Sequence, residues 1–118
     1  MLRPDRGIER VYLHRAPVDM RKQMDGLAIL AKEVIQQDPM SGSLFCFTNA
    51  RRNKLKILVW ENNGFIVWYK PLEQHRFAWP RSGDAVLTLT GEQLNWLLDG
   101  YDVWRMKPHE VLHFSVFS

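Results

Sequence analysis

The segment from Lys54 to Leu72 constrains the fold more than any other part of the sequence, because it predicts an antiparallel hairpin. Residues 54–61 and 65–72 each have the composition of a β-strand, and the first alternates apolar and polar residues. Asn62-Asn63-Gly64 lies between them, and Asn and Gly accept the positive φ that tight hairpin turns require. The sequence therefore predicts two long strands that pair with each other.

The length of the hairpin loop decides which side chains share a face, and the sequence leaves two lengths open. A three-residue loop with Gly64 in the left-handed conformation pairs Glu61 with Phe65. One face is then basic and aromatic: Lys54, Lys56, Leu58, Trp60, Ile66, Trp68 and Lys70. The opposite face is almost wholly apolar and suits a core: Leu55, Ile57, Val59, Phe65, Val67 and Tyr69. A two-residue loop instead moves Trp68 and Lys70 to the core side.

The N-terminal half predicts a strand, a longer helix and a second strand. Residues 8–14 read as the first strand, which Pro17 ends. Asp19 stands at the N-cap position of a helix with an apolar stripe, although Asp25 could instead cap a helix that starts near Gly26. The stripe comprises Met20, Met24, Leu27, Ala31, Val34 and Ile35, and Gln37, Asp38 and Pro39 end the helix. Residues 44–48 form a continuously apolar strand, which indicates cover on both faces.

The C-terminal half predicts two short strands and a short helix. Residues 76–79 could add an edge strand before Pro80, and residues 85–90 read as the last strand. Thr90 and Gln93 match a capping box, and Gly100 is the expected end of the helix that follows. Residues 101–118 carry no clear pattern.

These elements predict one α+β domain of 118 residues: an antiparallel sheet of about five strands, one longer helix in the N-terminal half and one short C-terminal helix. The longest apolar runs have four or five residues, so no membrane span is expected. The first residues lack the apolar core of a secretory signal, and the single cysteine excludes an intramolecular disulfide. We therefore expect a reduced, cytoplasmic setting.

Positive charge is concentrated in residues 50–81, which hold seven Lys and Arg against two Glu in a chain of net charge +3. Such a region indicates a polyanionic partner. The candidate DNA contacts here are the cations Arg51, Arg52, Lys54, Lys56 and Lys70, with Trp60 and Trp68 for base stacking. The alternative, which the pattern alone slightly favours, is a half-buried sheet face on which lysine stems lie along tryptophans.

Arg21 and Lys22 form a second basic candidate, just after Asp19. Cations at a helix N-terminus oppose the helix dipole, but a helix N-terminus with basic side chains can also bind a phosphate. The simpler interpretation is a salt link to Asp19 or Asp25, or plain exposure to solvent.

A third pattern is His109-Glu110-Val111-Leu112-His113, which matches the zinc-binding string H-E-x-x-H. A catalytic zinc needs three protein ligands, and nothing marks the third, although His14 and His75 are available. If the segment is a strand, its two histidines lie ~13 Å apart, too far to share a metal. Cys46 lies in an apolar run and reads as a buried structural thiol. We therefore expect no catalytic residues, metal or cofactor.

Read in order, motifs from residue 8 to about residue 104 resemble those of one protein family. They are Val18-Asp19-Met20-Arg21-Lys22, Asp25-Gly26-Leu27, Asp38-Pro39, Gly42, Leu44-Phe45, Asn49, Arg51-Arg52, Lys56-Ile57-Leu58, Trp60, Gly64, Tyr69-Lys70, Leu72-Glu73, Phe77, Trp79-Pro80, Leu94, Leu97-Leu98 and Gly100. The chain resembles the small accessory protein encoded by the second reading frame of insertion sequences of the sixty-six family, often called TnpB. The tail from Trp104 is the part that matches least.

The resemblance implies a bacterial mobile-element protein that assists transposition without catalysing it. In that family a separate, larger transposase carries the acidic catalytic residues, so the implied partners are DNA, the transposase and other proteins of the same element. A second hypothesis is a protein–protein adaptor without DNA contact, anchored by exposed Trp60 and Trp68. A remote third is a zinc hydrolase that uses His109, Glu110 and His113. The resemblance leaves the oligomeric state open.

Overall fold

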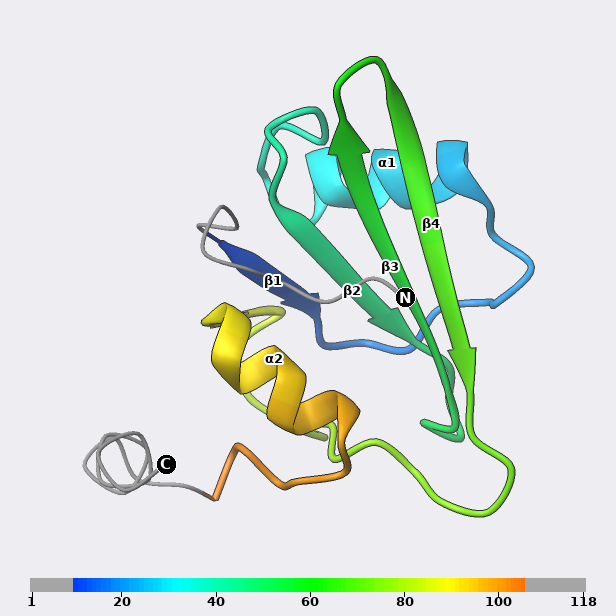
Figure 1. The fold of residues 1–118 in the computed structure, drawn as a ribbon, viewed down its shortest axis with the longest axis vertical. Coiled ribbons are helices and arrows are strands. Elements are labelled where there is room, and N and C mark those ends of the chain that lie inside the picture. The colour runs from blue at the N-terminus through cyan, green and yellow to red at the C-terminus, as the bar shows by residue number, and fades with distance from the viewer. Residues whose placement is uncertain (1–9, 106–118) are drawn as a thin grey trace.

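The computed structural model describes residues 10–105, which form one open five-stranded sheet with a helix on each face (Figure 1). The elements, in chain order, are β1 (Val11–His14), α1 (Met24–Glu33), β2 (Leu44–Thr48), β3 (Lys54–Glu61), β4 (Gly64–Pro71), β5 (Val86–Leu89) and α2 (Gly91–Leu98). The α+β class is confirmed, with the longer helix in the N-terminal half and the short helix after the last strand.

The strand order is β4-β3-β2-β1-β5, and three of the four pairings are antiparallel. β1 and β2 are parallel, which differs from the antiparallel sheet expected from the sequence. A parallel pair needs a crossover rather than a tight hairpin, and α1 supplies that crossover. After β4 the chain returns past β3 and β2, so that β5 pairs with β1 at the far edge.

The sheet separates two hydrophobic cores, and β2 contributes to both. All five residues of β2 are buried, which confirms the strand predicted to be covered on both faces. Phe45 and Phe47 pack on the α1 side with Leu27 and Ala31. On the other side, β2 and β3 pack against the helix α2 and residues 103–104, through Leu44, Cys46, Leu55, Ile57, Leu94 and Leu97. The fold thus has three layers, helix, sheet and helix.

The N-cap of α1 lies four residues beyond Asp19, the first N-cap position predicted from the sequence. The N-cap is Gln23, whose side chain makes no capping hydrogen bond, so both Asp19 and Asp25 were wrong as caps. Asp19 instead closes a turn, in which its carboxylate accepts from the backbone N–H of Arg21 at 2.8 Å. The helix ends at Glu33, before the predicted stop at residues 37–39, and Gln36 then takes a positive φ of 60°.

The helix α2 follows its sequence signals closely. Gln93 N–H donates to the Thr90 hydroxyl at 3.1 Å, and Thr90 N–H donates to the Gln93 side chain at 2.9 Å, which confirms the capping box. At the other end, Gly100 has a φ of 99°, and the N–H groups of Gly100 and Tyr101 bond to the carbonyls of Leu97 and Trp96. This is the Schellman arrangement, and it confirms Gly100 as the helix stop.

The segment between β4 and β5 is an anchored loop. The short edge strand expected over residues 76–79 was wrong, since these residues join no strand. Phe77 and Trp79 are buried in the α2-side core instead, and Phe77 N–H donates to the Arg52 carbonyl at 2.7 Å. None of the described helices is long and apolar enough to cross a membrane.

Candidate nucleic-acid interface

The β3–β4 hairpin has the two-residue loop, with Glu61 opposite Gly64. Asn62 provides the positive φ of the turn, at 57°, and Gly64 does not adopt the left-handed conformation required by the three-residue alternative. Every residue of β4 is therefore displaced by one position relative to that alternative, which places its side chains on the other face.

This register separates the residues that would have formed one basic, aromatic face. Lys56 and Trp60 lie on the α1 face, because they pair with Tyr69 and Phe65. Trp68 pairs with Ile57 and packs against the α2-side core. Lys70, two residues further along β4, lies on that same side. The interface expected along the hairpin was therefore wrong in its geometry. The two tryptophans are half-buried, on opposite faces.

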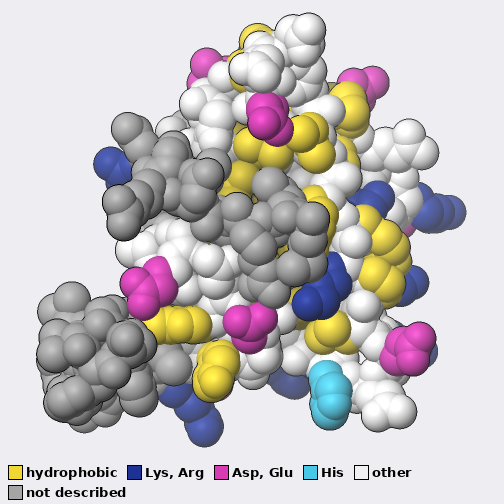
Figure 2. All heavy atoms as spheres, viewed as in Figure 1, with side chains coloured by type: hydrophobic (Ala, Val, Ile, Leu, Met, Phe, Trp, Pro, Cys, Tyr) yellow, Lys and Arg dark blue, Asp and Glu magenta, His cyan; other side chains and the backbone are white. Residues whose placement is uncertain are grey.

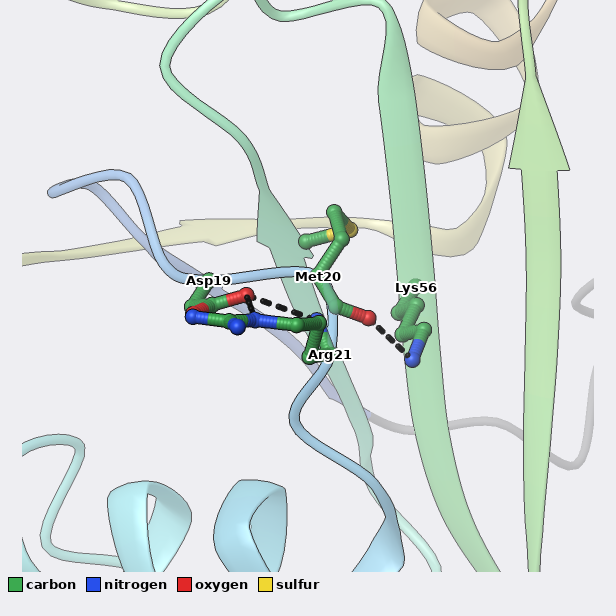
Figure 3. Close-up of polar contacts among 4 residues, drawn as sticks. All are labelled: Asp19, Met20, Arg21 and Lys56. Carbon is green, nitrogen blue, oxygen red and sulfur yellow. Dashed lines mark hydrogen bonds and ion pairs between the residues drawn. The ribbon is translucent and has the colours of Figure 1, made fainter.

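The lysines of the hairpin are also used inside the fold. Lys56 Nζ donates to the Met20 carbonyl at 2.7 Å (Figure 3). It also donates to the Lys22 carbonyl at 2.7 Å and lies 5.8 Å from the centre of the Tyr69 ring. Lys70 Nζ lies 3.4 Å from the Leu98 carbonyl, at the end of α2. On the face in Figure 2, Lys and Arg side chains lie at several separate places. The ammonium groups thus tie neighbouring elements to the sheet.

Arg21 precedes α1 rather than lying in its first turn, and it is paired. Its guanidinium donates to both Asp19 carboxylate oxygens, with a shortest N–O distance of 2.7 Å (Figure 3). Hydrogen bonds from the Arg21 side chain and backbone lower the Asp19 pKa from 3.8 to about 2. The salt link considered from the sequence is therefore confirmed, and the site is not a helix N-terminus.

The Asp19 carboxyl should titrate near pH 2 in an NMR pH titration, and Arg21→Ala should return the midpoint toward the ordinary value. Because the folded pKa is lowered, the contribution of this pair to stability is present above pH 3.8 and is lost as the pH falls toward 2. Arg51→Ala serves as the control and should leave the Asp19 midpoint unchanged. A midpoint near 4 in the unmodified protein would contradict the ion pair.

At one end of the sheet β2 and β4 finish and β3 begins (Figure 1). A different set of cations lies at this end. We call Arg15, Arg52, Arg76 and Arg81 the arginine cluster. Arg15, Arg52 and Arg81 line one open pocket of about 210 Å³. Arg76 comes close to Arg52 along the chain's path, because the next residue, Phe77, donates its backbone N–H to the Arg52 carbonyl at 2.7 Å. Burial and the positive charges of Arg81 and Arg76 lower the pKa of Arg52.

Short hydrogen bonds fix the backbone around the arginine cluster. Arg15 donates from Nε to the Asp84 carbonyl at 2.9 Å and from Nη1 to the Arg81 carbonyl at 3.1 Å. The indole N–H of Trp79 donates to the Arg15 carbonyl at 3.1 Å. These bonds tie the end of β1 to the loop that carries Arg76 and Arg81.

The turn that carries Arg52 is equally well defined. The Asn49 side chain accepts from the backbone N–H groups of Asn53 and Lys54, each at 3.1 Å. Arg52 itself has a φ of 58°, a conformation that non-glycine residues adopt only where their surroundings hold it. The cluster is therefore built on fixed backbone.

The arginine cluster has no acidic partner among residues 10–105. In residues 10–105, the ion pairs that involve described residues only are Arg21–Asp19 and Arg105–Asp102. The Arg15 guanidinium bonds to backbone carbonyls, which carry no net charge. Guanidinium groups held close together without carboxylates form a site for anions, and phosphate is the anion whose geometry they match.

The sequence pointed to only part of this cluster. Arg52 was among the candidate DNA contacts, and Arg51 is an exposed neighbour of it. Arg76 and Arg81 lie within the basic segment 50–81, so the charge count was their only signal. Arg15 gave no signal, because only the pairing of β1 with β2 brings it to this end of the sheet.

The residues considered for zinc do not form a site in the described part of the chain. His109, Glu110 and His113 lie outside the described residues, and no group of three metal-binding side chains occurs within residues 10–105. His14 is buried, with Nδ1 2.8 Å from the Ala16 carbonyl. Cys46 is fully buried, which confirms a structural thiol, and burial raises its pKa.

The fold defines a small α+β protein that carries a cluster of arginines at one end of its sheet. The chain belongs to the IS66 Orf2-like family, whose model matches residues 9–108, and this confirms the resemblance seen in the sequence. Membership implies a role in transposition of IS66 elements.

Two relatives come from Sinorhizobium fredii and are described only as uncharacterized proteins. One, y4jC, is 34% identical over 111 residues, which cover 94% of each chain. The other, y4hO, is 32% identical over 96 residues, which cover 81% of this chain and 83% of the relative. No solved structure matches the chain.

Proposed function

We propose that this protein is a non-catalytic accessory factor of IS66 transposition that binds DNA through the arginine cluster. The observation that carries this proposal is a pocket lined by Arg15, Arg52 and Arg81, on backbone held by hydrogen bonds and without acidic partners among the described residues. Guanidinium groups bind phosphate oxygens in pairs of hydrogen bonds, and such contacts hold DNA without reading its sequence. The catalytic steps belong to a separate transposase of the same element.

Some of the contacts expected from the sequence stay in this proposal. Arg52 belongs to the arginine cluster, and Arg51, Lys22 and Lys54 are kept as flanking cations. The remaining cations already have partners: Lys56 and Lys70 bond to carbonyls, and Arg21 is paired with Asp19. Arg15 also bonds to two carbonyls, but a guanidinium has five N–H groups, so three remain for a phosphate. Stacking of bases on Trp60 and Trp68 receives no support, because both indoles are half-buried. The same burial argues against these two residues as anchors of a protein–protein adaptor.

The salt dependence of binding to a short DNA duplex, followed by fluorescence anisotropy, tests the proposal. Four phosphate contacts should give a slope of log K against log salt of about −3.6, because each contact releases ~0.9 counterion. Affinity should then fall by about 100-fold between 50 and 200 mM salt. Duplexes of unrelated sequence should bind equally well, since the contacts are to the backbone.

Two matched variants make this test specific. Arg52→Gln should make the slope less steep by about 0.9, which is the value for one phosphate contact. Lys32→Gln removes the same charge from an exposed position in the last turn of α1 and should leave the slope unchanged. Binding that does not depend on salt, or a slope that both variants reduce equally, would refute the arginine cluster as the DNA site.

A further inference from the structure

The pocket within the arginine cluster is more specialised than a flat basic surface. It is lined by charged, polar and apolar residues: Arg15, Arg52, Arg81, Thr48, Trp79 and Pro80. Among the described residues, no Asp or Glu contributes to its lining. Its volume of about 210 Å³ is below the ~300–1,000 Å³ of pockets that enclose a drug-sized molecule. A phosphate group fits such a space better than a whole nucleotide does.

The concave shape matters because phosphates in DNA differ in shape and charge. An internal phosphodiester carries one charge and has a sugar on each side, so it can lie across the mouth of a pocket but cannot enter it end-on. A terminal phosphomonoester has one sugar and three free oxygens, and it carries nearly two charges at neutral pH. Three guanidinium groups around one pocket offer more hydrogen bonds to the terminal group than to the internal one.

The walls of the pocket suit the rest of a strand end. Trp79 and Pro80 provide apolar surface beside the arginines, on which a terminal sugar can pack. The Trp79 indole N–H donates to the Arg15 carbonyl, and this bond holds the Trp79 ring beside Arg15. Positioned groups of this kind bind a ligand with a smaller loss of conformational entropy.

We propose that this pocket binds the terminal phosphate of a DNA strand, so that the protein recognises phosphorylated DNA ends in preference to the continuous duplex. The inference rests on the proposed function, because it assumes that the arginine cluster meets DNA. It assigns the pocket to one chemical group, a phosphomonoester. It also separates the three arginines that line the pocket from Arg51 and Arg76, which lie outside its lining.

The test compares four forms of one 20-base-pair duplex at fixed salt by fluorescence anisotropy. The forms carry 5′-phosphate ends, 3′-phosphate ends, hydroxyl ends, or ends closed by loops. A phosphorylated form should bind about tenfold more tightly than the hydroxyl and closed forms. The comparison of 5′ with 3′ ends identifies which terminus the pocket takes. Free inorganic phosphate, added at constant ionic strength, should reduce the preference.

Two substitutions distinguish the pocket from the surface around it. Arg81→Gln should abolish the preference for phosphorylated ends, and thermal unfolding would verify that the exposed substitution leaves the fold intact. Arg51→Gln removes an equal charge from outside the pocket and should weaken binding to all four forms alike while preserving the preference. Equal, salt-dependent affinity for all four forms would overturn this inference and leave the proposed function standing. Absence of binding to every form would overturn both.

Discussion

Reversing two charges, with Arg52→Glu and Arg81→Glu in one protein, should lower the affinity for duplex DNA by about 100-fold or more. Each substitution removes a charge-assisted hydrogen bond of ~1.5–3 kcal/mol and places a negative charge where a phosphate would bind. Two lost bonds alone correspond to roughly 3–6 kcal/mol, and each 1.4 kcal/mol is a factor of ten in affinity. Fluorescence anisotropy at 100 mM salt gives the comparison.

The control for this experiment must change the net charge by the same amount. Arg10→Glu with Lys32→Glu does so at two exposed positions outside the arginine cluster. This control should weaken DNA binding only modestly, because it changes only the long-range electrostatic field of the protein. The loss of affinity should become smaller as salt is added. If the control protein and the Arg52→Glu, Arg81→Glu protein bound DNA equally weakly, affinity would depend on net charge alone. The arginine cluster would then have no special role.

The features that the sequence predicted well are those whose cause is local. Thr90 and Gln93 stand three residues apart, and the hydrogen bonds of a capping box need nothing beyond that spacing. Gly100 can adopt a positive φ at almost no cost, so it ends the helix wherever the chain goes next. The burial of β2 followed from its continuous apolar residues in the same way.

The hairpin register depends on a choice that the local chemistry leaves nearly balanced. Asn62 and Gly64 can each take a positive φ, and the two choices differ by one residue in loop length. In the structure it is Asn62 that does so, and Trp68 then lies against the α2-side core. Trp68 and Val67 are then both partly buried, against the cores on opposite faces of the sheet. The register therefore depends on how well each side chain fits its core. The sequence pattern could not weigh that fit, because each face had an apolar candidate.

The arginine cluster could not be predicted because its members come from separate segments. Arg15 follows β1, Arg52 lies in the turn between β2 and β3, and Arg81 lies far along the loop after β4. The parallel pairing of β1 with β2 and the anchoring of Trp79 bring them together. Neither of these long-range contacts has a signature in the sequence, so charge density over residues 50–81 was the only guide.

Phe45→Ala should be among the most destabilising single substitutions in the protein, at about 3–5 kcal/mol of unfolding free energy. The Phe45 side chain is fully buried at the centre of the α1-side core, and its ring stacks on Tyr12 with 5.7 Å between centroids. Truncation removes apolar contacts and leaves a cavity that neighbouring strands restrain from closing. Because small domains are stable by only ~5–15 kcal/mol, the loss is a large share of the total.

Denaturant unfolding measures this loss, and Ile29→Ala is the matched control. Ile29 lies on the outer side of α1 with 54% of its surface exposed, so its truncation should change the unfolding free energy by no more than about 0.5 kcal/mol. The Phe45→Ala protein should unfold at clearly lower denaturant, with an unchanged slope if its denatured state is unaltered. A loss below about 1 kcal/mol would mean that the α1-side core closes around the cavity, and that α1 packs on the sheet less rigidly than its buried contacts imply.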